Sequence, residues 1–283
     1  SMSHRPRSAI PAQPMSHHCR NTMTHRLLLL LCLLTTALPA QSILDRYDFR
    51  RASSVVELPA ALREISGLAA ASADAVYAHN DERGRVFVID VRSGALLRSF
   101  DLGSDKLRED FEGIAYAEGK LWLTTSSGTL YEFQDGADSS SMRYTVHRSA
   151  LNNGNDVEGL CYDAANKVLL LACKGTAGKG AAGDKAIYAF SVDTRKLDPT
   201  PRFLLPKAKL ERHAAGKGIG PSGIEYLPQS GTFLLLSSEG RYLLELRGNG
   251  EIIGAVRLEK KRHRQPEGVR SEERRVGKEC RSR

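Results

Sequence analysis

The sequence has few cysteines, and their spacing suggests neither cross-links nor zinc. Beyond the N-terminal region they are Cys161, Cys173 and Cys280, and no set of cysteines and histidines has zinc-site spacing. In a hairpin that turns near Ala165, Cys161 would face about Leu170 and would not meet Cys173. We therefore expect Cys161 and Cys173 to be free, buried thiols, with no disulfide framework.

The folded part of the chain also lacks an excess of positive charge. The net charge is +8, but residues 1–26 carry four arginines and no acid, and residues 270–283 carry six basic and three acidic side chains. The rest of the chain is nearly neutral. A nucleic-acid partner needs lysine and arginine clustered on the folded surface, so the charge distribution argues against one.

Two common catalytic motifs are missing. No serine lies in the G-x-S-x-G frame of a nucleophile elbow. Residues 175–180 contain glycines and a lysine but lack the phosphate-loop spacing, and no helical pattern follows them. We interpret that stretch as a surface loop, and Trp122 and the tyrosines as packing residues of strands. We interpret four scattered histidines as surface residues: His79, His147, His213 and His263.

The N-terminal hydrophobic run is too short to span a bilayer, which takes about 20 residues. This run, residues 27–34, follows Arg26 and precedes small residues such as Ala37 and Ala40. A basic flank, a short apolar run and a small-residue exit are typical of a signal peptide. We predict an extension and signal peptide over residues 1–40 and an exported protein that is periplasmic, secreted or associated with the cell envelope. An uncleaved membrane anchor is the alternative.

The chain does contain a repeated motif, in which a polar residue is followed by glycine and an aliphatic residue. It occurs five times, at residues 64–68, 110–114, 156–160, 220–224 and 265–269. The glycines at 67, 113, 159, 223 and 268 are separated by 46, 46, 64 and 45 residues. A period in the forties with several short strands per repeat is typical of β-propeller blades.

Four short strands are predicted in each of the first four repeats, with turn residues between them. After the strand that carries Gly67, the first repeat has strands at 75–78, 85–91 and 96–102. The second has 111–116, 120–125, 129–133 and 143–147. The third has 157–162, 167–173, 186–191 and 202–205, with extra length at 174–185 and 207–220. The fourth has 222–226, 232–237, 242–247 and 251–258. The predicted fold class is all-β: a β-propeller over residues 41–269, with four complete blades, an incomplete fifth and almost no helix.

The fifth repeat begins at Gln265 and loses its apolar alternation after Val269. We interpret residues 270–283 as an unpacked, non-native tail, so that part of the natural chain would be missing; a solvated basic tail is the alternative. Residues 47–58 end in an apolar run that begins at Val55, and this segment would then be the outer strand of the last blade and would close the ring.

A family resemblance rests on the order of eight motifs. They are I-S-G-L, H-N-D, D-F-E-G-I, V-E-G-L-C-Y-D, A-C-K, A-I-Y-A-F, P-S-G-I and Q-P-E-G-V. This order resembles the SdiA-regulated family of exported or membrane-anchored bacterial propellers, over about residues 47–269. The resemblance implies five blades, a bound calcium ion and no established biochemical activity. The chain departs from the family pattern at its C-terminus.

The residues before the repeated glycines suggest a metal site. They begin the inner strands at one mouth of the central channel and include Glu112, Glu158 and Glu267, and the antiparallel second strands return Asp81 and Glu239 to that mouth. Like charges held close together must protonate or bind a cation, and oxygen ligands suit calcium. We predict that the three glutamates bind calcium, with Asp81 and Glu239 as outer oxygens. The alternative is that Glu-Gly is a turn signature whose carboxylate caps backbone N–H groups.

Three functions are compatible with the sequence. The first is an extracytoplasmic propeller that binds calcium at the channel mouth and a small ligand or an envelope protein on that face. The second is a calcium-dependent lactonase or esterase of the gluconolactonase-like type, which needs a base within about 3 Å of the attacking water. The third is a structural module of the envelope without a site. We favour the first because the sequence marks no residue as that base.

Overall fold

We describe the fold from a computed structural model. It describes residues 41–104, 107–177, 182–215 and 218–271. The predicted signal peptide, Cys280 and residues 272–283 of the predicted tail lie outside this part of the chain. Among the described residues, no helix has both the length and the apolar character that a membrane crossing would need.

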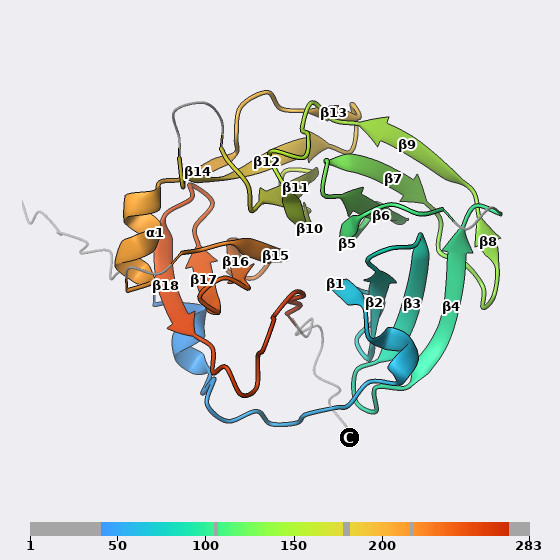
Figure 1. The fold of residues 1–283 in the computed structure, drawn as a ribbon, viewed down its shortest axis with the longest axis horizontal. Helices are drawn as coiled ribbons and strands as arrows, with labels where there is room; N and C mark the ends of the chain where they lie inside the picture. The colour runs from blue at the N-terminus through green and yellow to red at the C-terminus, as the bar shows by residue number, and fades with distance from the viewer. Residues whose placement is uncertain (1–40, 105–106, 178–181, 216–217, 272–283) are drawn as a thin grey trace, which may run out of the picture. The chain divides into compact units, whose positions relative to one another are not determined.

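Four antiparallel sheets make up most of residues 65–257, and each corresponds to one predicted repeat (Figure 1). Blade 1 contains β1 (Ile65–Ala70), β2 (Ala75–Asn80), β3 (Arg85–Asp90) and β4 (Leu96–Leu102). Blade 2 contains β5 (Phe111–Ala117), β6 (Lys120–Thr125), β7 (Thr129–Phe133) and β9 (Tyr144–Arg148). Blade 3 contains β10 (Val157–Asp163), β11 (Val168–Cys173), β12 (Lys185–Ser191), β13 (Lys196–Leu197) and β14 (Phe203–Leu205). Blade 4 contains β15 (Pro221–Leu227), β16 (Thr232–Ser237), β17 (Tyr242–Leu246) and β18 (Ile252–Arg257). The predicted all-β propeller is confirmed.

The outer edges of the blades are less regular than the repeat predicts. The short strand β8 (Ser141–Met142) leaves blade 2 and pairs in parallel with β4 of blade 1, with Asp101 opposite Ser141. In blade 3, β13 and β14 each pair with a different part of β12. The fourth strand of blade 3 is therefore split into two short pieces.

One α-helix, α1 (Lys207–His213), occurs among the described residues, within the segment 207–220 that was predicted only as extra length of the third repeat. Its residues K-A-K-L-E-R-H include several strong helix formers, and they follow Pro206, which cannot continue a strand ladder. Leu210 is buried between blades 3 and 4, and the Tyr242 hydroxyl donates to the Ala214 carbonyl at 3.0 Å. Two short 3-10 helices, η1 (Ile43–Arg46) and η2 (Ala60–Leu62), precede blade 1.

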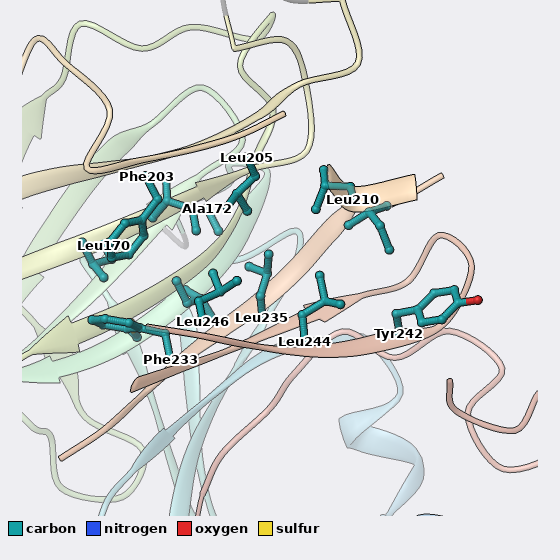
Figure 2. Packing of buried hydrophobic residues seen from close by; sticks show 14 of the residues in the cluster. Leu170, Ala172, Phe203, Leu205, Leu210, Phe233, Leu235, Tyr242, Leu244 and Leu246 are labelled. Atoms are coloured by element: carbon teal, nitrogen blue, oxygen red, sulfur yellow. The ribbon is translucent and has the colours of Figure 1, made fainter. Parts of the chain in front are cut away.

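The core consists of apolar faces of neighbouring blades packed against each other. Figure 2 shows the cluster between blades 3 and 4, where Phe203 and Leu205 face Phe233, Leu235 and other side chains of blade 4. Burying a side chain of this size contributes about 1.5–3 kcal/mol. Cys161 lies opposite Leu170 in the β10–β11 hairpin, and Cys161 and Cys173 are free and buried, so both cysteine predictions are confirmed.

The repeated glycines bring the inner strands of successive blades into close contact. A Cβ at Gly113 would lie 2.9 Å from the amide nitrogen of Leu160, and one at Gly159 would lie 3.0 Å from the Cα of Gly223. A Cβ at Gly268, in the fifth motif, would lie 3.4 Å from the amide nitrogen of Leu68 in blade 1. The five motifs therefore follow one another around the centre, and the fifth returns to the first.

The fifth motif has no regular secondary structure, although it occupies the place of an inner strand between β15 and β1 (Figure 1). The Ser222 hydroxyl donates to the Pro266 carbonyl at 2.7 Å, and Arg270 forms an ion pair with Glu225. The prediction that the chain is unpacked from Arg270 onward is therefore wrong for Arg270. A β-strand needs a hydrogen-bonded neighbour, and here none follows within the described residues.

The predicted strand around Val55 is also not formed. Residues 47–58 contain no strand, and Val55 is 87% exposed. The reason is physical: the strand would have to pair with the outer part of a fifth blade, which the described chain does not contain. The N-terminal segment instead attaches to blade 4, where Glu245 accepts hydrogen bonds from the Ser42 hydroxyl at 2.5 Å and the Ile43 amide at 2.7 Å.

Candidate functional site

The site is built on an irregularity that recurs at the start of the inner strands. The register between the first and second strands shifts across Ser66, Glu112, Glu158 and Ser222, each just before its glycine. A bulge of this kind leaves one residue unpaired and changes the direction of its side chain. Glu112 and Glu158 therefore leave the ladder of their own blade.

One small cavity is lined by all five motifs. Its polar lining residues are Ser66, Glu112, Glu158 and Glu267, and the rest are the five glycines and the aliphatic residues that follow them. The Ser66 hydroxyl donates to Glu112 at 3.2 Å. We call this end of the channel the acidic mouth. The three glutamates that the sequence singled out thus come from the second, third and fifth repeats and line a common space.

The carboxyl groups at the acidic mouth raise one another's pKa values. Burial, followed by the negative charges of Glu158 and Asp110, raises the pKa of Glu112 to about 8. Burial also raises the pKa of Glu158, and Glu267 adds to that shift although Lys174 opposes it. For Glu267, burial raises the pKa, with a further contribution from Asp81. The mouth therefore concentrates negative charge that water solvates poorly.

Lys174 brings a positive charge to this mouth. Its ammonium group donates to Glu158 at 2.6 Å, and Lys174 and Glu158 are 40% and 15% exposed in their side chains. Although burial lowers the pKa of Lys174, the hydrogen bond to Glu158 and the neighbouring acids raise it overall. A basic residue beside a glutamate compensates part of the charge that a metal ion would otherwise neutralise.

The two predicted outer oxygens are placed differently. Asp81 interacts electrostatically with Glu267, and its Oδ1 atom is buried without a hydrogen-bond partner. Glu239 instead lies against Gly218 and Gly220, where an added Cβ would meet its carboxylate. Asp81 is thus the residue whose unsatisfied oxygen suits a cation, whereas Glu239 packs against the chain that leads into β15.

The residue types at the acidic mouth are ones that calcium binds, but their side chains are not arranged around a common point. Carboxylate and hydroxyl oxygens are the ligands that calcium prefers, and it takes six to eight of them. Across the described ranges, however, no group of three or more His, Cys, Asp or Glu side chains is placed to hold a metal ion. A calcium ion would need Glu158 to leave Lys174 and further oxygens to come from water.

His79, interpreted from the sequence as a surface residue, is fully buried. Its ring lies against Gly67, where an added Cβ would be 2.8 Å from Nε2, and Nδ1 lies 3.1 Å from the Asn80 carbonyl. Burial lowers the pKa of His79 to about 4. The interpretation was wrong because the second strand continues inward to Asn80, which places His79 behind the first glycine motif.

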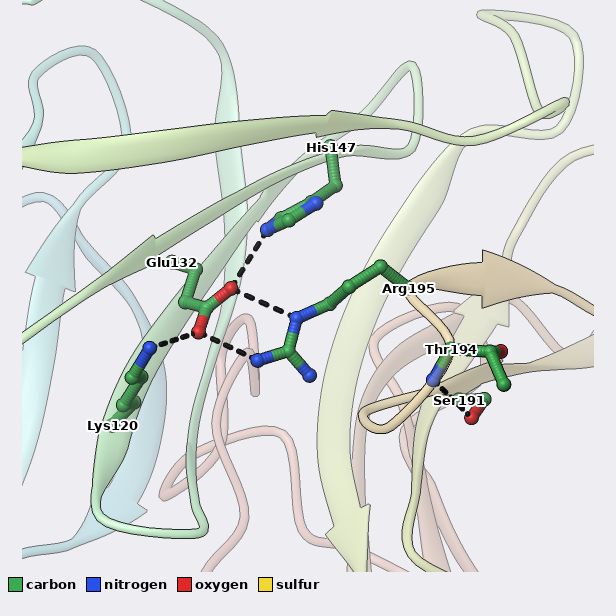
Figure 3. Close-up of polar contacts among 6 residues, drawn as sticks. All are labelled: Lys120, Glu132, His147, Ser191, Thr194 and Arg195. Atoms are coloured by element: carbon green, nitrogen blue, oxygen red, sulfur yellow. Dashed lines mark hydrogen bonds and ion pairs between the residues drawn. The ribbon is translucent and has the colours of Figure 1, made fainter.

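A second polar cluster, not identified from the sequence, joins blades 2 and 3 (Figure 3). Glu132 on β7 is 6% exposed and accepts from Lys120 at 2.5 Å, from His147 at 2.8 Å and from Arg195 at 2.8 and 3.0 Å. Arg195 also lies over the Trp122 ring, 5.0 Å from its centroid. His147 was another predicted surface histidine, and the structure places it in this cluster. The Glu132 carboxylate accepts four hydrogen bonds from these side chains and has little capacity for a ligand, which indicates a structural role.

Comparison with known families decides the assignment. The sequence model of the SdiA-regulated family matches residues 47–275. The chain belongs to the SdiA-regulated family. The match to this family continues six residues beyond 269, the predicted end of the propeller. No curated protein matches the chain.

Solved structures give distant likenesses. They include Kuenenia stuttgartiensis hydrazine synthase (12% identity, TM-score 0.40), a nidogen–laminin complex (14%, 0.43) and a Bacteroides thetaiotaomicron protein of unknown function (13%, 0.43). The alignments cover 68%, 68% and 67% of this chain and 48%, 64% and 42% of those chains. The chain thus spans less than two thirds of the length of each. At these values the likenesses say nothing about function.

Proposed function

We propose that this propeller is an exported calcium-binding protein whose ion binds at the acidic mouth. The observation that supports the proposal is that Glu112, Glu158 and Glu267 come from three repeats and line the same small cavity. Burial raises the pKa of each, so the carboxyl groups at this mouth favour protonation, pairing with Lys174 or binding of a metal ion. A divalent cation would relieve this repulsion.

The position of Lys174 determines which carboxylates are available to calcium. The lysine and a metal ion compete for Glu158, because a carboxylate oxygen that accepts from an ammonium at 2.6 Å cannot also approach calcium closely. Glu112 and Glu267 are then the carboxylates that a calcium ion meets first, with Ser66 and Asp81 as neighbouring oxygens. Calcium affinity is therefore expected to be moderate, and to rise when the lysine is removed.

Binding is better supported than hydrolysis. A lactonase or esterase mechanism needs a base that can reach the attacking water. His79 is the histidine next to the first motif, but it is fully buried behind Gly67, and its ring Nδ1 lies against the Asn80 carbonyl. We therefore do not put forward the hydrolase as a second function.

Calcium titration monitored by thermal unfolding tests the proposal. Calcium at about 100 times its dissociation constant should stabilise the folded protein by about 2.7 kcal/mol, and magnesium should have a smaller effect. Glu112→Gln should weaken this response, and Lys174→Met should shift the titration midpoint to lower calcium. Glu251→Gln, in an exposed ion pair with Arg247, is the matched control. An unmoved melting curve in the wild type, or equal responses in all variants, would refute the site.

Export is tested separately. Fusing residues 1–45 to a reporter enzyme that is active only outside the cytoplasm should give an active reporter, because the basic flank and apolar run would direct translocation. The matched variant places two lysines in the apolar run, Leu29→Lys and Leu30→Lys, and should abolish activity. A reporter that stays inactive with the native segment would contradict the export proposal without affecting the calcium proposal.

A further inference from the structure

A second cavity lies at the opposite ends of the inner strands. Its volume is about 860 Å³, and it is lined by residues of β1, β5, β10 and β15 together with Arg270. On β5, Tyr116 follows Glu112 by four residues, which is about 13 Å along a strand. The tyrosine end of this cavity is therefore well separated from Glu112, although Leu68, Ile114 and Leu160 also line the cavity of the acidic mouth. Its volume is within the range of small-molecule sites.

The repeat places a tyrosine at the same position of three blades. Tyr116, Tyr162 and Tyr226 each follow their repeated glycine by three residues, and all three line the cavity. The corresponding residue of blade 1 is Ala70, which leaves open the space that a fourth ring would fill. Tyr116 is 44% exposed, which is unusual for a large aromatic side chain on an inner strand. We call this end the tyrosine mouth. The sequence-based view of these tyrosines as packing residues is incomplete.

Each of the three rings is supported from behind. Tyr116 stacks on Tyr77, with ring centroids 6.0 Å apart and planes inclined by 23°. Tyr162 donates its hydroxyl to Glu118, and the Tyr226 ring lies 5.1 Å from the Phe233 ring. Side chains held in place by such contacts lose little freedom when a ligand binds, which favours affinity.

The charges of the lining residues indicate what charge a ligand of this cavity should carry. Among the described lining residues, Glu225 is the acid and Arg270 the base, and they form an ion pair with each other. The strand residues Leu68, Ile114 and Leu160 supply an apolar floor. A site with balanced charge, aromatic walls and a few polar groups suits an uncharged ligand with both an apolar face and polar edges.

We propose that the tyrosine mouth binds a neutral sugar ring. The C–H face of a pyranose stacks on tyrosine, and its hydroxyl groups meet the tyrosine hydroxyls and the Glu225–Arg270 pair at the edge of the cavity. We expect binding to be independent of calcium, because Tyr116 lies about 13 Å along the strand from Glu112, although the apolar floor lines both cavities.

Ligand-detected NMR by saturation transfer tests the proposal. The probes are the methyl pyranosides of glucose, galactose and N-acetylglucosamine at millimolar concentration, with phenol and choline as competing chemistries. At least one glycoside should give a saturation signal that persists in a chelator. Tyr116→Ala should weaken its binding about two- to tenfold, because a stacking contact is lost, and Tyr116→Phe should retain that contact.

Two further variants make the outcome decisive. Ala70→Phe should fill the open side of the cavity and abolish binding, and Tyr47→Ala, an exposed tyrosine of the N-terminal segment, should leave binding unchanged. The proposal is overturned if no glycoside binds, if only phenol or only choline binds, or if Tyr116→Ala and Ala70→Phe both bind like the wild type. Melting curves of each variant identify any that fail to fold.

Discussion

Replacing Glu132 by glutamine should destabilise the propeller strongly, because it removes the acid that three basic side chains share. Glu132 is 6% exposed, whereas the side chains of Lys120, His147 and Arg195 are 40%, 15% and 34% exposed. Removing one partner of a fully buried ion pair costs about 3–5 kcal/mol. Since the basic partners are partly solvated, we expect about 2–3 kcal/mol here, or a melting temperature lower by about 5–10 °C.

The pH dependence gives an independent check on this cluster. Burial alone would raise the pKa of Glu132, but hydrogen bonds from Lys120, His147 and Arg195 outweigh it and lower the pKa. The stabilising contribution is therefore present above the pKa of an unfolded glutamate and is lost as the pH falls through the folded-state pKa. The difference in unfolding free energy between wild type and Glu132→Gln should shrink below about pH 4.5.

Urea denaturation between about pH 3 and 7 measures both effects, with Glu251→Gln as the matched control. That glutamate pairs with Arg247 in an exposed setting, so its loss should cost less than about 1 kcal/mol. In a double-mutant cycle, Arg195→Met should cost less in the Glu132→Gln background than in the wild type. If Glu132→Gln is as mild as the control, or if the two substitutions are additive, the cluster does not hold blades 2 and 3 together.

Two further predictions concern the inner strands. The pKa of Glu112 is raised to about 8, so between about pH 4.5 and 8 the folded protein keeps a proton that the unfolded chain loses. With a chelator present, the free energy of unfolding should therefore fall by on the order of 2–4 kcal/mol as the pH rises through this range. Glu112→Gln should flatten this slope in urea titrations, and identical slopes would contradict the burial of the carboxyl. Gly159→Ala should cost about 1–3 kcal/mol, because its Cβ would lie 3.0–3.1 Å from the backbone of the 223–224 segment. Gly248→Ala, whose nearest neighbour would be 3.9 Å away, should change the unfolding free energy by less than about 0.5 kcal/mol, and equal losses would argue against close strand packing.

Much of the fold was predictable because it depends on short-range patterns. A repeated glycine spacing of 45 or 46 residues indicated blades, and alternating apolar residues placed the four strands of each blade. The pairing of Cys161 with Leu170 across the β10–β11 hairpin followed from the position of its turn. One exception was α1, whose helix formers lie in a segment without a repeat counterpart and are held by the burial of Leu210 between two blades.

The candidate sites were only partly predictable because each combines residues from distant parts of the chain. The repeat identified Glu112, Glu158 and Glu267, but not that Lys174 pairs with Glu158. The three tyrosines also recur at one position of the repeat. That they line a cavity depends on Ala70 in blade 1 and on Arg270, which reaches Glu225 across 45 residues of sequence.

The sequence by itself determined the repeat, the strand order within each blade and the glycines at which neighbouring blades approach, because these depend on residue spacing and on the absence of a Cβ. The tertiary structure decided which charges pair, which histidines are buried, and whether Val55 and the fifth motif form strands. Those outcomes depend on the dielectric environment and on hydrogen-bonding partners from other blades. A strand-forming sequence without a neighbouring strand remains irregular, as residues 47–58 and the fifth motif do here.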